Sequence, residues 1–341
     1  MVTRKDDTIL FDRPPVIAAW AAAGGKKEGE GPLAAGFDLL VRDASFAGEG
    51  CANWEQAESL LQQKAAAACL RKGGVSRKEV DLVLAGDLQA QCTASSYALR
   101  ALGAPYAGVY GACSTMAETL ALAACLAAGG MARQLLAMTS SHFCAAERQF
   151  RTPLVYGAKR TPTAQWTATA AGACLLRAPG QRGVRVRSVT FGRVQDYAVR
   201  DINNMGAAMM PAAASTLLRY FAASGTDPAD LDAVFTGDLG AVGSALLGEQ
   251  MAREGVPLPN HRDCGCLLYD AARQDVQAGG SGAGCSAAVL CAHILPALQR
   301  GNLRRVLFVA TGALMSQTTF LQGESIPGIA HCVELERGED A

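Results

Sequence analysis

Short, strongly apolar segments alternate along the chain with longer runs of good helix formers. Residues 80–87 and 135–139 predict buried strands, and residues 54–72 and 114–128 predict helices. Asn53 is a suitable N-cap for the first helix, and a glycine pair follows each of the two helices. Strands this apolar are typical of a sheet with helices on both faces.

The second half of the chain repeats this order. Residues 230–238 resemble residues 79–87, and Cys285 follows Cys113 by as many residues as separate Thr311 from Thr139. We therefore predict an α/β protein made of two similar units, residues 1–180 and 181–341, stacked as α/β/α/β/α layers. Two unrelated dinucleotide-binding domains are the alternative. The glycine-rich segment 280–284 only imitates their fingerprint, because it lacks the expected strand and downstream acid.

Two segments near the N-terminus look peripheral. Residues 15–19 predict a strand at the edge of the sheet, since a proline opens the segment. Residues 26–32 carry lysines, glutamates and glycines, and this composition predicts a charged turn.

Composition and charge narrow the function classes. The 341 residues carry no formal net charge, which argues against a general nucleic-acid binder. The start of the chain has no secretory pattern, and the longest apolar helical runs, residues 120–128 and 285–298, are too short to span a bilayer. The twelve cysteines contain no C-x-x-C pair and lie mostly in apolar runs, so we expect free thiols in a reducing, cytoplasmic compartment and no metal site.

Cys113 is the strongest chemical feature. It stands where a glycine turn enters the apolar helix, close to unpaired N–H groups and the positive end of the helix dipole. Both effects favour the thiolate, so the sequence predicts a reactive sulfur here. A small side chain that only packs under the helix start is the alternative.

The motif Tyr110-Gly-Ala-Cys-Ser-Thr115 and its glycine-rich counterpart Ala278-Gly-Gly-Ser-Gly282 resemble those of the thiolase and β-ketoacyl-synthase superfamily. More narrowly, the chain is similar to the stage V sporulation protein AD family of endospore-forming bacteria over nearly its whole length. Further matching blocks are residues 29–32, 84–88, 139–142, 146–151, 162–167, 204–206, 236–240, 274–276 and 322–327.

This resemblance implies a thiolase-like duplicated α/β/α/β/α fold without catalysis or a cofactor. It implies binding of dipicolinic acid (pyridine-2,6-dicarboxylate), free or as its calcium chelate, during uptake into the developing spore. The expected partners are the membrane proteins of the stage V sporulation A operon. The expected location is cytoplasmic, at the periphery of the inner forespore or spore membrane, and the expected assembly is a homodimer.

The departure from condensing enzymes supports a non-catalytic protein. Those enzymes pair the cysteine with a His-x-x-Asn segment and a second asparagine or histidine, which stabilise the oxyanion. Here the corresponding segments read Thr236-Gly-Asp-Leu239 and Gly279-Gly-Ser-Gly282. A Cys113-dependent acyltransferase or thiolase remains the alternative function.

An aromatic dicarboxylate needs hydrogen-bond donors for its carboxylates and apolar walls for its ring. Residues 141–166 carry several cations against one acid, Glu147, together with Phe150, Tyr156 and Trp166. Those arginines could instead pair with nearby acids, and Asp238 could serve a turn or face a calcium-bridged ligand. The predicted ligand-binding residues are Cys113, Ser140, Ser141, His142, Arg148, Trp166, Asp238 and Ser281.

Overall fold

The computed structural model describes residues 2–151, 153–154 and 159–338. Most strands join one large mixed sheet in the order β12-β11-β14-β15-β10-β3-β9-β7-β5-β6. The strands of the first half are β3 (Val16–Gly24), β4 (Leu39–Leu40), β5 (Leu82–Gly86), β6 (Tyr106–Gly108), β7 (Gln134–Ser141), β8 (Trp166–Thr167) and β9 (Ala170–Arg177). Those of the second half are β10 (Val184–Thr190), β11 (Ala233–Thr236), β12 (His261–Asp263), β13 (Gly280–Ser281), β14 (Arg305–Ala313) and β15 (Gly328–Glu336).

The two ends of the sheet have the same plan. In the first half β5 runs parallel to β6 and β7, and β9 runs antiparallel between β7 and β3. In the second half β11 runs parallel to β12 and β14, and β15 runs antiparallel between β14 and β10. The fold is therefore a duplicated one, as predicted. The predicted unit boundary after residue 180 falls between β9 and β10 and stays a prediction.

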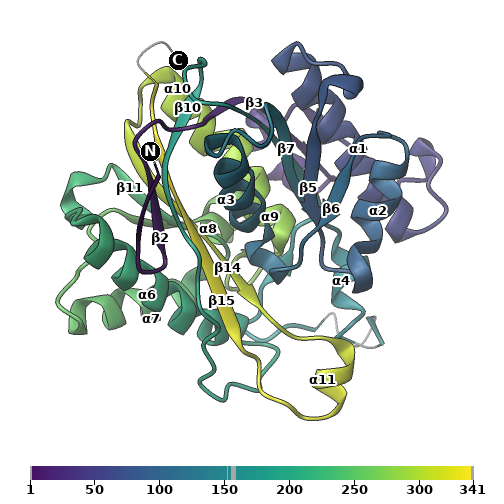
Figure 1. Ribbon diagram of the computed structural model, residues 1–341. Helices are drawn as coiled ribbons and strands as arrows, with labels where there is room; N and C mark the ends of the chain where they lie inside the picture. Colours follow the sequence, from purple (N-terminus) through teal and green to yellow (C-terminus); the bar gives the residue numbers. More distant parts are fainter. Residues whose placement is uncertain (1, 152, 155–158, 339–341) are drawn as a thin grey trace.

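Helices form three layers around the two halves of the sheet (Figure 1). One outer layer packs on β3 and β9, a second outer layer packs on β14 and β15, and a central layer lies between the halves. The outer helices are α1 (Trp54–Gly73) and α2 (Thr93–Arg100) on the first half, and α6 (Met205–Ser224) and α7 (Gly240–Arg253) on the second. The central helices are α3 (Thr115–Ala128), α8 (Cys264–Leu268), α9 (Ala283–Val289) and α10 (Leu295–Arg300). Two short helices, α4 (Phe143–Glu147) and α11 (Gln317–Leu321), lie in connections.

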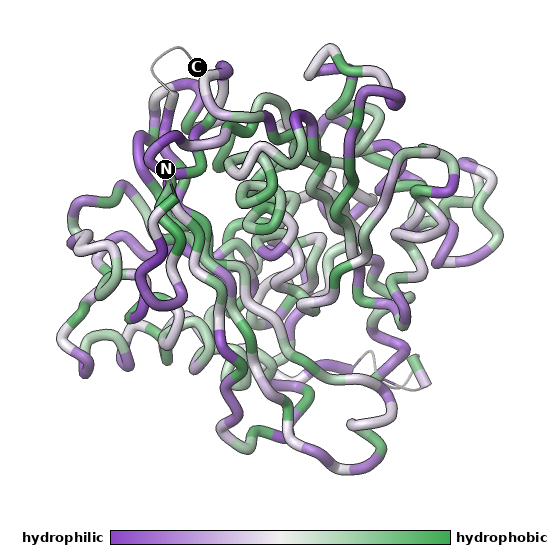
Figure 2. The backbone as a smooth tube through the Cα atoms, in the orientation of Figure 1, coloured by the Kyte–Doolittle hydropathy of each residue, from purple (hydrophilic) through white to green (hydrophobic). Residues whose placement is uncertain are grey.

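The central helix α3 explains why its sequence is apolar all round. It contacts β5, β7 and β9 of the first half and β14 and β15 of the second, so almost every side faces protein. The tube along this helix is mostly green in Figure 2, and its buried alanines and leucines belong to the largest hydrophobic core cluster. No helix in the described part of the chain is long and apolar enough to cross a membrane.

The prediction of an edge strand in the N-terminal region is wrong. Residues 16–19 belong to β3, which lies between β9 and β10 in the middle of the sheet, and nearly all its side chains are buried. Pro15 stands just before this strand, so it removes no hydrogen bond from the interior. The predicted turn at residues 26–32 is present, but its Glu28 is buried and accepts hydrogen bonds from the Tyr269 hydroxyl and the Thr169 N–H.

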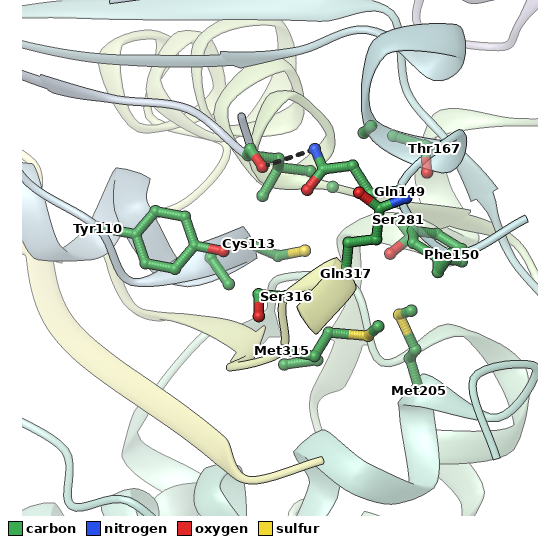
Figure 3. A pocket seen from close by; sticks show the side chains of 15 residues that line it. Tyr110, Cys113, Gln149, Phe150, Thr167, Met205, Ser281, Met315, Ser316 and Gln317 are labelled. Carbon is green, nitrogen blue, oxygen red and sulfur yellow. Dashed lines mark hydrogen bonds between the residues drawn. The ribbon is translucent and has the colours of Figure 1, made fainter. Parts of the chain in front are cut away.

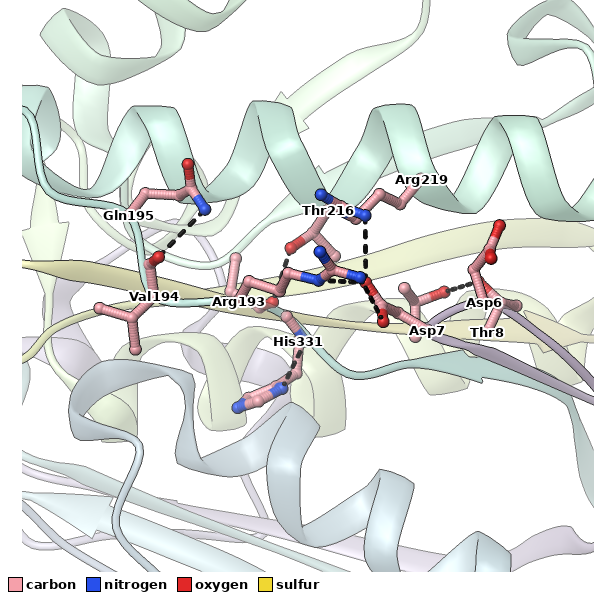
Figure 4. A network of polar contacts seen from close by, with 12 residues as sticks. Asp6, Asp7, Thr8, Arg193, Val194, Gln195, Thr216, Arg219 and His331 are labelled. Carbon is pink, nitrogen blue, oxygen red and sulfur yellow. Dashed lines mark hydrogen bonds and ion pairs between the residues drawn. The ribbon is translucent and has the colours of Figure 1, made fainter.

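The hairpin β1 (Val2–Lys5) and β2 (Thr8–Phe11) joins the second half, because β2 pairs with β10. Figure 4 shows Asp7, in its turn, facing Arg193 and Arg219. The carboxylate of Asp7 lies 2.8 Å from Arg193 Nε and 3.3 Å from an Arg219 Nη, and the hydrogen bond to Arg193 lowers its pKa. The N-terminal hairpin is thus held by β10, a strand that comes about half the sequence later.

Candidate functional site

Cys113 lies in the short 3-10 turn Ala112–Ser114 that leads into α3. Ala112 has a φ of 51°, a left-handed conformation that is uncommon for a residue with a side chain. Gly312 of β14 packs against this turn, and a Cβ atom at Gly312 would lie 2.2 Å from the carbonyl oxygen of Gly111. The second half of the protein therefore holds the turn in place at a position where only a glycine fits.

A buried carboxylate lies beside the Cys113 sulfur. Asp238 follows β11 and is fully buried. Its Oδ1 accepts a hydrogen bond from the Thr311 hydroxyl at 2.9 Å, and its Oδ2 accepts from the Ser281 hydroxyl at 2.9 Å and the Gly282 N–H at 2.8 Å. The Cys113 thiol is near enough to this carboxylate for the two groups to influence each other's pKa. Asp238, the turn at Ser281 and Gly282, and Thr311 of β14 are distant in sequence, and these hydrogen bonds join them next to the start of α3.

The prediction of a thiolate at Cys113 is wrong. Burial, followed by the negative charge of Asp238, raises the pKa of the Cys113 thiol well above its ordinary value, and the opposing hydrogen bonds from Gly282 and Ser281 are weaker influences. Burial also raises the pKa of Asp238 to about 6. The start of α3 does favour a negative charge here, but the group that carries this charge is the Asp238 carboxylate and not the Cys113 sulfur.

The sulfur faces a cavity between the two halves of the protein. The cavity contains about 500 Å³ of empty space, including the part open to solvent. In Figure 3 the sulfur points into it, with Tyr110, Ser281 and Met315 around it. The walls are largely apolar and the polar contributions come from hydroxyls, amides and the thiol. The lining residues are Leu88, Tyr110, Ala112, Cys113, Ala146, Gln149, Phe150, Thr167, Met205, Ser281, Gly282, Ala313, Met315, Ser316 and Gln317.

The lining contains no histidine and no asparagine among the residues that the structure describes. Thr236, where a condensing enzyme has its histidine, is fully buried and donates a hydrogen bond to Asp263 Oδ2 at 2.6 Å. The catalytic amide is replaced by the turn at Ser281, which supports Asp238 instead. The geometry can therefore hold a small molecule, but it does not supply the groups that activate a thioester.

The predicted residues at the end of β7 do not line this cavity. Ser140 points to the opposite side of the sheet, where its hydroxyl donates to Glu58 at 2.8 Å. The Ser141 hydroxyl donates to the Ala168 carbonyl and accepts from the Gly284 N–H, so it ties α9 to the sheet. His142 is buried against the Phe46 ring, and burial lowers its pKa to about 4. Of the eight predicted residues, the structure brings Cys113, Asp238 and Ser281 together.

The basic and aromatic insertion is used mostly for internal contacts. Arg148 pairs with Glu55 and lies in a wider groove next to the cavity. Trp166 stacks on Phe143 with ring centroids 4.0 Å apart, and the Lys27 ammonium lies 3.9 Å from its ring centroid. The alternative that the arginines pair with nearby acids therefore describes Arg148, while Tyr156 falls outside the described residues.

Two buried polar residues near the cavity were missed by the sequence reasoning. Arg151 and Gln165 line a small extension that shares Ser281 with the main cavity. The Arg151 guanidinium is paired with Glu147 and donates from Nη1 to Asn203 Oδ1 at 2.7 Å. The side-chain amide of Gln165 donates to the Asp238 and Gly280 carbonyls. Only the density of cations in residues 148–160 signalled such a residue, and it did not distinguish Arg151 from Arg148.

No group of three or more metal-ligating side chains occurs among the residues that the structure describes. All twelve cysteines are free, and most of them are buried. The site therefore offers hydrogen bonds and apolar contacts, without a protein-made metal centre in the described ranges.

The sequence matches the family described as Stage V sporulation protein AD (SpoVAD) over residues 5–336. It is 41% identical over 336 residues to Stage V sporulation protein AD of Bacillus subtilis (strain 168), and the match covers 98% of each chain. Among solved structures, it is similar to 3-oxoacyl-[acyl-carrier-protein] synthase III from Aquifex aeolicus VF5, with a TM-score of 0.57 and 12% identity over 94% of this chain and 99% of that one. An OleA variant from Xanthomonas campestris with cerulenin gives a TM-score of 0.60 and 13% identity over 96% and 97%. These structural similarities show that the duplicated fold is thiolase-like, as predicted.

Proposed function

Since the chain belongs to the stage V sporulation protein AD family, we propose that it binds dipicolinic acid in the cavity at Cys113 and serves the uptake of this ligand into the developing spore. The observation that carries the proposal is an apolar cavity at Cys113 whose sulfur lacks the catalytic partners of condensing enzymes. A scaffold with these properties binds without turnover.

The shape and chemistry of the cavity suit a small aromatic ring. Apolar walls with a few polar groups are typical of small-molecule pockets. Phe150, Met205 and Met315 offer apolar and polarisable surface for a ring, and the Tyr110 hydroxyl can donate to a carboxylate oxygen. Among the described residues that line the cavity and its adjoining extension, Arg151 is the one cation.

The charge of Asp238 bears on which form of the ligand binds. At neutral pH this buried carboxylate, with a pKa of about 6, is largely ionised and repels a free dianion. The neutral calcium chelate avoids this repulsion, because the cation cancels the charge of the ligand. Binding is therefore expected to be tighter with calcium above pH 6, and the difference is expected to shrink as Asp238 becomes protonated at lower pH.

Calorimetry with pyridine-2,6-dicarboxylate, with and without calcium, tests the proposal. We expect saturable binding that weakens at least about tenfold in Tyr110→Phe, since a hydrogen bond to a charged oxygen contributes roughly 1.5–3 kcal/mol. Arg148→Ala is the matched control, because Arg148 lies outside the cavity lining. Absence of binding at millimolar ligand in both conditions would refute the proposal. Equal affinities for the wild-type protein and Tyr110→Phe would show that the ligand binds elsewhere.

A Cys113-dependent acyltransferase is the alternative, because the sulfur does open onto the cavity. The raised thiol pKa disfavours it, since the thiolate is the nucleophile. Incubation with an acyl-coenzyme A followed by intact mass measurement separates the two. An acyl adduct that disappears in Cys113→Ala would establish the enzyme.

Assembly and location belong to the same proposal. We propose a homodimer that docks from the cytoplasmic side on membrane proteins of the stage V sporulation A operon, at the inner forespore or spore membrane. β6 ends the strand order of the first half, so its outer edge is available for pairing with a second copy. Light scattering gives the assembly, and co-purification with spore membranes gives the location.

A further inference from the structure

The end of the molecule opposite the Cys113 turn is where β3, β7, β10 and β14 begin and where β9 and β15 end. It is at the top of Figure 1, around the labels α10 and β10. The strand register aligns one row of neighbouring residues across this end, from β14 to β7. The row consists of Arg305, Glu336, Arg185, Val16, Arg177 and Gln134. Charged residues that flank these strands therefore gather on one surface.

Exposed arginines surround this row. They come from the segments that precede β3, β7 and β14, from the connection between β9 and β10, from the end of α10 and from the residue after β15. Those that are exposed and form no ion pair with an acid that the structure describes are Arg13, Arg133, Arg182, Arg300, Arg304 and Arg337. Both halves of the protein thus contribute guanidinium groups that are available to a partner.

The acids at this end are fewer, and internal contacts hold most of them. Asp81 accepts hydrogen bonds from backbone N–H groups just before and at the start of β7, and Asp232 accepts them in the same way at β14. Glu336 Oε2 lies 3.8 Å from Arg185 Nη1 and 3.7 Å from Arg187 Nη1. The other acids are Asp12, Glu79, Asp227, Asp230 and the buried Glu334. The described residues of this end therefore carry a net positive charge, although the whole chain is formally neutral.

An apolar side chain is exposed among these charges. Met131 lies between the end of α3 and the start of β7, two residues before Arg133, and it is 71% exposed. The surface of an anionic bilayer offers phosphate groups to the arginines and an apolar region to this side chain. A nucleic acid backbone offers only the phosphates. The combination favours a lipid surface.

We propose that this arginine-rich end, made up of the exposed arginines listed above together with Met131, binds the surface of a bilayer that contains anionic lipids. The proposal rests on the membrane location proposed above and names the surface that contacts the lipid. The guanidinium groups donate to lipid phosphates, and Met131 enters the interface. α3 separates the Cys113 turn from Met131 by its 14 residues, roughly 21 Å, so the cavity stays on the side away from the lipid.

Sedimentation of the full-length protein with vesicles tests the proposal. We expect binding to vesicles of phosphatidylcholine and phosphatidylglycerol in equal parts, weaker binding as the salt concentration rises, and no binding to phosphatidylcholine alone. The triple variant Arg133→Ala/Arg182→Ala/Arg304→Ala should bind the mixed vesicles about 100-fold more weakly, since each cation at the surface contributes about fivefold. Met131→Ser should weaken this binding about threefold.

The matched control is Arg148→Ala/Arg200→Ala/Arg273→Ala, which removes the same charge from exposed positions outside the arginine-rich end. It should bind the mixed vesicles like the wild-type protein, and a loss as large as in the first triple variant would overturn the assignment to this surface.

Two other results would overturn the lipid partner. One is no binding to the mixed vesicles, or equal binding to phosphatidylcholine alone. The other is tighter binding to a short DNA duplex that is lost in the first triple variant, with Met131→Ser unchanged on vesicles, which would favour a nucleic acid. Calorimetry with dipicolinate on the first triple variant should match the wild-type protein, so a failure of this proposal is distinguishable from a failure of the cavity.

Discussion

Replacing Asp238 by asparagine is expected to lower the pKa of the Cys113 thiol while the fold is kept. The side chain has the same shape, and all its present partners can be retained. The amide oxygen can keep the Ser281 hydroxyl and the Gly282 N–H, which cannot turn around. The amide nitrogen then faces the Thr311 hydroxyl, which can rotate from donor to acceptor.

The size of the effect follows from the removed charge. Two unit charges about 4 Å apart repel by about 4 kcal/mol at an effective dielectric constant of about 20. At 1.36 kcal/mol per pH unit, this corresponds to a pKa about 3 units lower for Cys113. A weaker base is also a poorer nucleophile, with a Brønsted coefficient of about 0.5, so roughly half of the gain in thiolate reaches the rate. Reaction at pH 8 should therefore be about 30-fold faster.

Methyl methanethiosulfonate is small enough to serve as the reagent, and peptide mass mapping follows Cys113 separately from the other cysteines. Cys332 is fully buried on β15 and reports unfolding, so its reactivity should stay at the wild-type level. The reasoning is refuted if Cys113 reacts no faster in Asp238→Asn while Cys332 remains protected. It would mean that burial alone, without the neighbouring carboxylate, suppresses the thiolate.

Three further changes test other parts of the structure. Burial raises the pKa of Glu58 from 4.5 to about 8, so the folded state binds a proton that the unfolded state releases, and stability should fall as the pH rises through this range. In Glu58→Gln, urea unfolding at several pH values should show a shallower decline, and an unchanged slope would contradict this origin. Gly312→Ala should lose about 1–3 kcal/mol and weaken ligand binding, because its Cβ would lie 2.2 Å from the Gly111 carbonyl; wild-type stability by denaturant unfolding would disprove the contact. Arg148→Ala should change stability by less than about 1 kcal/mol and leave dipicolinate affinity within twofold, since the Arg148 side chain is 46% exposed, and a tenfold loss by calorimetry would extend the site to the outer groove.

The repeated sequence pattern predicted the duplicated fold well, because each half has to bury the same apolar faces. Asn53 caps α1 by accepting from the Gln56 N–H, and α3 begins just after the predicted glycine turn. The central position of β3 was not predictable from its own sequence. The strands that pair with β3 are β9 and β10, which lie more than 140 positions later in the sequence. The hydrophobic pattern within β3 cannot predict pairing with residues so far away.

The site was predicted in part for a related reason. The position of Cys113 follows from its local turn, whereas its protonation depends on Asp238, a residue of the other half. Ser140 and Ser141 illustrate the same limit, since neighbouring residues on a strand point to opposite faces and the sequence did not identify the inner one. Arg151 and Arg148 differ through burial: the Arg151 side chain is 6% exposed and the Arg148 side chain 46%, although the two residues are only three positions apart.

The strand order has a consequence for biosynthesis. β15 follows every other described strand in the sequence, yet it lies between β14 and β10 in the interior of the second half. Before β15 is made, the apolar strands β14 and β10 each lack the partner that lies between them. The N-terminal strand β2 then has to pair with a β10 strand whose other edge is incomplete. Non-local pairing of this kind is slow and exposes nascent chains to aggregation. A truncation of even the last dozen described residues would remove a central strand and is expected to prevent folding, rather than to trim an edge.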